Sequence, residues 1–220
     1  CDELCDGHPL CGPCEAELPW LDGRCATCAV PLPTHGLVCG ECQKRPPSYD
    51  HVEVPWRFAF PVDALITRFK HQARWPFGRL LGERLALHLQ HAFTDGLPQP
   101  DLLVPVPLAR RRLRQRGFNQ AQMLAQWLGG ALKLPVDEHL LERVVDTPPQ
   151  QQLDAATRRR NLRQAMCLAP GNDIKGRHLA LIDDVLTTGA TAEALARLLK
   201  RAGAVRVDVY CLARTPKPGD

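Results

Sequence analysis

Long hydrophobic runs are absent from this sequence of 220 residues. No stretch approaches the roughly 18 consecutive apolar residues that mark a membrane-spanning helix. No signal peptide opens the chain, and because it begins on Cys1 rather than Met, we expect some N-terminal residues to be missing. The composition, 45% hydrophobic and 24% charged, excludes a disordered or fibrous protein. We therefore expect a cytoplasmic protein without membrane insertion, made of one ordinary domain and a small appendage.

Cysteine is scarce over most of the chain. Beyond residue 42 there are only Cys167 and Cys211, which fall in apolar segments and are expected to be small core residues. A secreted protein framed by disulfides would spread its cysteines through the core, whereas C-x-x-C spacings favour metal binding in an intracellular protein. The other eight of the 10 cysteines are crowded into the pairs Cys1-x3-Cys5, Cys11-x2-Cys14, Cys25-x2-Cys28 and Cys39-x2-Cys42.

These pairs predict a metal-bound head. Two C-x-x-C turns supply the four thiolates of one structural zinc site, so eight cysteines predict two zinc ions. The first pair departs from the usual spacing: Cys1 fits the second member of a C-x-x-C whose first cysteine the sequence does not include, which leaves Cys5 as either a bystander or a substitute ligand. His8 and His35 are alternative ligands.

A head that reads nucleic acid is the alternative to a purely structural one. Residues 1–50 carry a net charge of −5, which counts against it. Because the whole chain is +4, residues 51–220 carry +9, so the body is the better candidate for binding nucleic acid or a polyphosphate.

The body alternates between predicted strands and helices after the Pro46-Pro47 linker. This alternation predicts a parallel sheet covered on both faces, with the function at the C-terminal ends of its strands. The predicted strands are 51–60 (broken at Pro55), 101–106, 139–145, 178–182 and 205–212; the predicted helices are 61–71, 76–93, 119–133 and 190–202; and 155–165 is either a basic helix or a loop.

The segment LALIDDVLTTGAT, residues 179–191, carries the chemistry. A short apolar strand leads into Asp183 and Asp184, then into a loop of threonines with one glycine, then into a helix. Gly189 lets the backbone approach a ligand, and the N-terminus of the helix offers free N–H groups to a phosphate. Carboxylates suit sugar hydroxyls and Mg²⁺. The alternative is an acid pair that only caps the helix.

This segment resembles the phosphoribosyl pyrophosphate (PRPP) signature of type I phosphoribosyltransferases. Further matches narrow the resemblance to the ComF family of competence protein F and its GntX-type relatives: VPVPL at 104–108, RGFNQ at 116–120, Gln152-Leu153 and RNL at 160–162. The resemblance implies a double zinc-ribbon head, residues 1–46, and a phosphoribosyltransferase-like domain, residues 51–220. The family pattern has C-x-x-C where this chain has Cys1-x3-Cys5, so one zinc ligand stays open.

The resemblance also implies roles for the residues. Asp183 and Asp184 would be the catalytic pair that holds the ribose hydroxyls, with Mg²⁺ accompanying PRPP. Residues 143–163 would be a lid, with arginines 158, 159, 160 and 163. The implied PRPP-binding set is Pro105, Val106, Pro107, Leu108, Arg116, Asp183, Asp184, Leu186, Thr187, Thr188, Gly189, Ala190 and Thr191.

Two functions stay open at this stage. One is Mg²⁺-dependent transfer of phosphoribosyl from PRPP to a nitrogen nucleophile in nucleotide metabolism. The other is a non-catalytic PRPP-binding or single-stranded-DNA-binding protein of DNA uptake. The arginines at 110, 111, 112, 114 and 116 could serve the leaving diphosphate, a nucleic acid or only solvent. His88 and His91 are expected to be an exposed helical pair, and the oligomeric state is not predicted.

Overall fold

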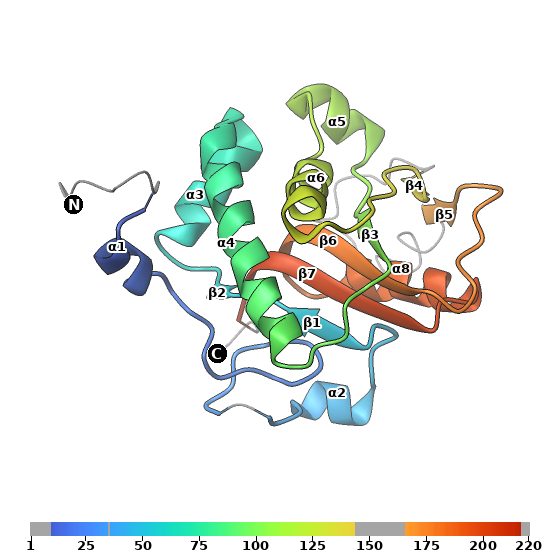
Figure 1. The fold of residues 1–220 in the computed structure, drawn as a ribbon, viewed down its shortest axis with the longest axis horizontal. Coiled ribbons are helices and arrows are strands. Elements are labelled where there is room, and N and C mark those ends of the chain that lie inside the picture. The colour runs from blue at the N-terminus through green and yellow to red at the C-terminus, as the bar shows by residue number, and fades with distance from the viewer. Residues whose placement is uncertain (1–9, 35, 144–165, 217–220) are drawn as a thin grey trace, which may run out of the picture.

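A computed structural model describes residues 10–34, 36–143 and 166–216. Its main sheet is parallel throughout, in the order β1-β7-β6-β3, with β2 beside β7 after the break at Pro55 (Figure 1). In the described part of the chain, no helix is long and apolar enough to cross a membrane. The strands of this sheet are β1 (His51–Glu53), β2 (Trp56–Arg57), β3 (Leu102–Pro105), β6 (His178–Leu186) and β7 (Arg206–Arg214).

Both faces of the sheet are covered, because successive residues of its central strands point to opposite sides. Leu179 and Leu181 of β6 pack on the side of α8 (Ala190–Arg201), whereas Ala180 and Ile182 pack on the side of three other helices. Those three are α3 (Val62–Gln72), α4 (Trp75–Thr94) and α6 (Gln120–Leu132). The predicted α/β fold, with a parallel sheet covered on both faces, is therefore confirmed.

The predicted helices agree with the structure to within one residue at most ends. Asn119 caps α6 by accepting a hydrogen bond from the Ala121 N–H, 3.0 Å, as a good N-cap residue should. In the described part of the body, two elements lack a predicted counterpart: the basic helix α5 (Arg110–Arg116) and strand β5 (Met166–Leu168), which pairs antiparallel with β4 (Leu141–Arg143). The predicted element at 155–165 lies outside the described residues.

The described part of the head packs on both sides of the sheet: Leu18 belongs to the buried cluster of α3, α4 and α6, whereas the cysteines from 25 to 42 belong to that of α8. The head contains the short helices α1 (Gly12–Ala16) and α2 (Gly40–Lys44). Cys25, Cys28, Cys39 and Cys42 belong to the same buried cluster as residues of β1, β6, β7 and α8. The head and the sheet therefore share one hydrophobic core on the α8 side.

Candidate functional site

A pocket of about 210 Å³ opens at the C-terminal ends of β3 and β6. This is the edge of a parallel sheet at which α/β proteins bind ligands. The structure brings together here the two acids, the turn after β3 and the start of α8. The lining residues are Lys70, Val106, Pro107, Leu108, Arg112, Arg116, Asn119, Gln120, Arg143, Asp183, Asp184, Val185, Thr187 and Thr191.

The acid pair lies within β6 rather than after it. Asp184 is buried, and its Oδ2 forms an ion pair with Lys70 Nζ of α3 at 2.6 Å. Asp183 accepts a hydrogen bond from the Asp184 N–H, 2.8 Å. Burial, together with the neighbouring Asp184 carboxylate, raises the pKa of Asp183, and the charge of Lys70 opposes this shift. Burial and the neighbouring carboxylate therefore favour the protonated form of Asp183, against the charge of Lys70.

The loop from Thr187 to Gly189 leads directly into α8. Gly189 has φ +75°, a left-handed conformation that glycine adopts without steric cost. The hydroxyl of Thr188 accepts a hydrogen bond from the Ala190 N–H, and Thr187 and Thr191 line the pocket. A helix of 12 residues thus begins beside the acid pair, with its positive end toward the pocket.

The turn after β3 is held by Asn119. Its side-chain Nδ2 donates to the carbonyl of Val106, 3.1 Å, so the cap of α6 also fixes this turn. Arg116 donates to the side chain of Gln120. Burial lowers the pKa of Arg116, and the charge of Asp184 opposes the shift. The geometry leaves cationic groups on the side of the pocket that faces the acids.

The predicted site residues do not all reach the pocket. Eight line it: Val106, Pro107, Leu108, Arg116, Asp183, Asp184, Thr187 and Thr191. Pro105, Leu186, Thr188, Gly189 and Ala190 belong to the backbone that carries them. Arg143 lines the pocket, but the rest of the predicted lid, with its arginines, lies outside the described residues. Sequence reasoning missed Lys70, Asn119 and Gln120, although the last two stand in the RGFNQ motif, and it left Arg112 open among the arginines that could serve the diphosphate.

Four buried cysteines form a candidate metal centre. The Sγ atoms of Cys25, Cys28, Cys39 and Cys42 all lie within 4.8 Å of one another. The Sγ atoms of Cys28 and Cys39 are 3.7 Å apart, close to the roughly 3.8 Å that a tetrahedron with Zn–S bonds of about 2.3 Å requires. Although burial opposes it, hydrogen bonds from backbone N–H groups lower the pKa of Cys25 to about 7. The spacing of the four sulfur atoms suits a zinc ion.

Only part of the second predicted zinc site lies within the described residues. Cys11 is buried just before α1 and Cys14 lies within it. The hydrogen bond between the two side chains raises the pKa of Cys14. Cys1, Cys5, His8 and His35 lie outside the described residues, so the second zinc ion stays a prediction.

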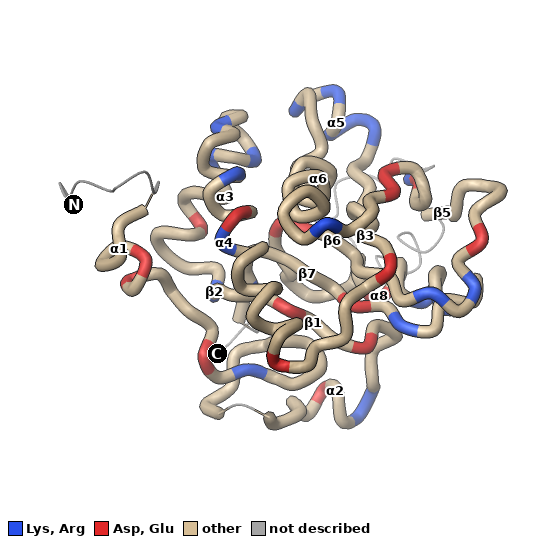
Figure 2. Tube along the Cα trace, in the orientation of Figure 1, with Lys and Arg blue, Asp and Glu red and all other residues tan. Residues whose placement is uncertain are grey.

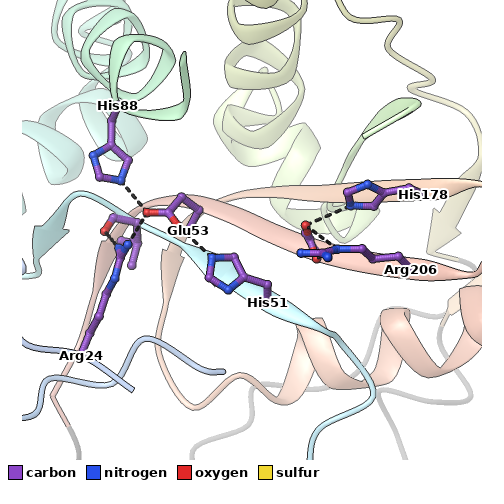
Figure 3. Close-up of polar contacts among 8 residues, drawn as sticks. Arg24, His51, Glu53, His88, His178 and Arg206 are labelled. Carbon is purple, nitrogen blue, oxygen red and sulfur yellow. Dashed lines mark hydrogen bonds and ion pairs between the residues drawn. The ribbon is translucent and has the colours of Figure 1, made fainter. Parts of the chain in front are cut away.

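The expectation that His88 and His91 form an exposed pair is wrong for His88. His91 is exposed, but His88 Nε2 lies 2.6 Å from Glu53 Oε1, in a cluster that also contains Arg24 and His51 (Figure 3). Glu53 is buried, and no local pattern predicts its partners, because they come from the head, from β1 and from α4. A second buried carboxylate, that of Asp208, bonds to His178 and Arg206, the two residues that Figure 3 labels on the other side of the view.

Comparisons with known proteins place the chain in a family. The model of the phosphoribosyl transferase domain matches residues 115–219. The DNA utilization protein YhgH of Escherichia coli is 37% identical, covering 95% of this chain and 92% of that protein. Competence protein F of Haemophilus influenzae is 36% identical, covering 93% and 90%. Competence protein ComFC of Bacillus subtilis is 28% identical, covering 94% and 84%.

Among solved structures, a purine phosphoribosyltransferase from Pyrococcus horikoshii is 17% identical, with a TM-score of 0.42, and the match covers 64% of this chain and 78% of that chain. The curated relatives, by contrast, match over nearly their whole length. The chain belongs to the ComF family of competence proteins and carries its phosphoribosyltransferase-type domain together with a cysteine cluster compatible with a zinc ribbon.

Proposed function

We propose that this protein binds PRPP with Mg²⁺ at the pocket between β3, β6 and α8, and transfers its phosphoribosyl group to a nitrogen nucleophile. One observation carries the proposal: two carboxylates, a threonine–glycine loop at a helix N-terminus and a proline-rich turn line one pocket of about 210 Å³. Each part suits one portion of the ligand.

The roles follow from the chemistry of each group. Asp183 and Asp184 accept hydrogen bonds from the ribose hydroxyls, while the loop from Thr187 to Thr191 holds the 5′-phosphate. The turn at Val106–Leu108 and the side chain of Arg116 are left for the diphosphate. Displacement at the anomeric carbon places negative charge on the leaving diphosphate, so fixed cations at this position stabilise the transition state.

The oxygen donors of the pocket fit a hard divalent cation. Asp183, Asp184 and the threonine hydroxyls are the ligand types that Mg²⁺ prefers. When bound with PRPP, Mg²⁺ would neutralise charge on the diphosphate. Lys70 forms an ion pair with Asp184, so a sugar hydroxyl or a metal ion that binds this carboxylate oxygen must displace the Lys70 ammonium group.

Replacing both acids tests the site assignment. The double variant Asp183→Asn/Asp184→Asn keeps the size of both side chains and removes both charges. We expect Mg²⁺-dependent PRPP binding, measured by calorimetry, to be lost. The matched control is Asp173→Asn, an exposed acid in the loop before β6, which should bind as the unaltered protein does. Undiminished binding in the double variant would contradict the assignment.

A non-catalytic role in DNA handling is the second candidate. Two observations favour it: relatives are named competence protein and DNA utilization protein, and α5 carries a row of exposed arginines. Figure 2 shows this cationic stretch at α5. Basic side chains supply most of the affinity for a nucleic-acid backbone, and such binding weakens as salt rises.

Two assays distinguish the candidates. Pyrophosphate release on a panel of bases and amines supports an enzyme, whereas PRPP binding without release supports the second role. Salt-dependent binding of single-stranded DNA that is lost when residues 110, 111, 112 and 114 are changed from Arg to Ala would support DNA handling. The control changes two arginines that do not line the pocket to Ala: Arg177, just before β6, and Arg201, the last residue of α8.

A further inference from the structure

Arg214, the last residue of β7, joins the cysteine cluster to the loop that we propose for the phosphate. It is buried, 6% exposed, and does not line the pocket. Its Nε donates to the carbonyl of Cys28 at 3.0 Å. Its Nη1 donates to the carbonyl of Leu186 at 2.9 Å and also to that of Thr187. One side chain therefore contacts both a cysteine turn and the first residues of the phosphate loop.

Arginine suits this place for a geometric reason. The carbonyls of Cys28 and Thr187 belong to irregular backbone, where no sheet partner satisfies them. A guanidinium group presents five N–H donors in one rigid plane, so it can serve several carbonyls from different segments, which the single ammonium of lysine cannot do in the same way. The position of Arg214 is in turn set by Cys28, whose Sγ lies within the four-thiolate cluster.

A second link joins the same two regions. Directly after the head, the N–H and hydroxyl of Ser48 donate to the carboxylate of Glu193 in the first turn of α8, at 2.6 and 2.9 Å. The buried Tyr49 places its hydroxyl beside the loop, since a Cβ on Gly189 would lie 3.4 Å from Tyr49 Oη. Contacts from the head and from the residues directly after it therefore hold the phosphate loop both at its start and at the helix that follows.

We propose that Arg214 is a positioning residue through which metal binding at Cys25, Cys28, Cys39 and Cys42 controls anion binding at the phosphate loop. The inference rests on the proposed PRPP site. A metal ion would hold the four thiolates together and so fix the Cys28 carbonyl. Arg214 donates to that carbonyl and also to those of Leu186 and Thr187, so fixing the first carbonyl fixes the guanidinium group and, through it, the start of the phosphate loop. Coupling between two binding sites is reciprocal, so a bound anion must raise the affinity for the metal by the same factor by which the metal raises the affinity for the anion.

The test measures zinc affinity in the full chain by competition with a chromophoric chelator, with and without ribose 5-phosphate. We expect ribose 5-phosphate to raise zinc affinity about fivefold or more, within the usual range of coupling between sites. Repeating the titration in a Cys11→Ser/Cys14→Ser background assigns the released metal to the described cluster. Arg214→Lys should abolish the difference, while Arg206→Lys, at the other end of the same strand, should keep it.

Each outcome bears on a different claim. If zinc-loaded protein binds neither ribose 5-phosphate nor PRPP, the proposed function fails. If it binds them but zinc affinity does not respond, the coupling fails and the proposed function stands. An unchanged coupling in Arg214→Lys overturns the role of Arg214. Should that variant not fold, Glu193→Gln, which weakens the Ser48 link at a part-exposed position, must reduce the coupling factor; an unreduced factor contradicts the proposal.

Discussion

Glu53→Gln is expected to cost far more stability than an ordinary ion-pair deletion. The side chain of Glu53 is 4% exposed and accepts from Arg24 Nη2 at 2.6 Å, His51 Nε2 at 2.8 Å and His88 Nε2 at 2.6 Å. Glutamine keeps the shape but turns an amide N–H₂ toward these donors and leaves the guanidinium of Arg24 without its counter-charge. Breaking a fully buried pair costs about 3–5 kcal/mol.

The estimate for this site is lower because the partners reach solvent. Their side chains are 19%, 23% and 26% exposed, so water can partly hydrate them after the change. We therefore expect a loss of about 2–3 kcal/mol, or about 4–12 °C in Tm for a chain of this size. The matched control is Glu83→Gln, because the Glu83–Arg79 pair is 46% and 63% exposed; its loss should be about 0.5 kcal/mol or less.

Urea denaturation at fixed zinc concentration measures both variants, and pH supplies a second check. Burial alone would raise the pKa of Glu53, but hydrogen bonds from His51 and His88 and the charge of Arg24 hold it well below its ordinary value. An acid with a lowered pKa stabilises the fold above its unfolded pKa, about 4.3, and loses that contribution as pH falls. The difference between Glu53→Gln and the unaltered protein should therefore shrink in acid. Equal losses for the two Gln variants at neutral pH would refute the reasoning.

Three further changes test the metal centre and the pocket. Cys25→Ser should remove one of about two zinc equivalents per chain in metal analysis, whereas a full complement would contradict the four-thiolate site. Lys70→Met removes the cation that lowers the pKa of Asp183, so the pH midpoint of Mg²⁺-dependent PRPP binding should rise in calorimetry, while Arg68→Met on the same helix leaves it unmoved. Gly189→Ala forces a side chain into φ +75°, at about 1–2 kcal/mol, and should weaken ribose 5-phosphate binding; Gly130→Ala, in open space on α6, should not.

Periodicity in the sequence predicted the sheet well, but it placed the end of β6 too early. The apolar run stops at Ile182, and charged residues ordinarily mark the end of a strand. The pairing nevertheless continues, with Asp183 opposite Cys211 and Leu186 opposite Arg214. Strand β7 supplies backbone partners beyond the apolar run, so the acids project from a rigid strand. No local pattern signals such tertiary pairing.

Contacts between distant segments explain the residues that sequence reasoning missed. Lys70 lies more than a hundred residues from Asp184, and helix α3 shows only its own amphipathic pattern. Helix α5 has five arginines in seven residues and none of them is buried, so it has no apolar periodicity to detect. The motif at 179–191 was informative for the opposite reason: strand, acids, loop and helix follow one another along the chain, and the site therefore lies largely in one segment.

The opposite net charges of residues 1–50 and of the body allow ion pairs between the two parts of the chain. Two acids of residues 1–50 pair with cations of the body: Glu15 with Arg84 at 2.9 Å and Asp50 with Lys200 at 2.7 Å. These pairs are part-exposed, so each contributes little stability. The buried cluster shared by the cysteines, β1 and α8 supplies the larger stabilisation, since it removes apolar surface from water. The ion pairs therefore orient the head while the core holds it, and this fixed orientation is what allows the Cys28 carbonyl to meet Arg214 beneath the phosphate loop.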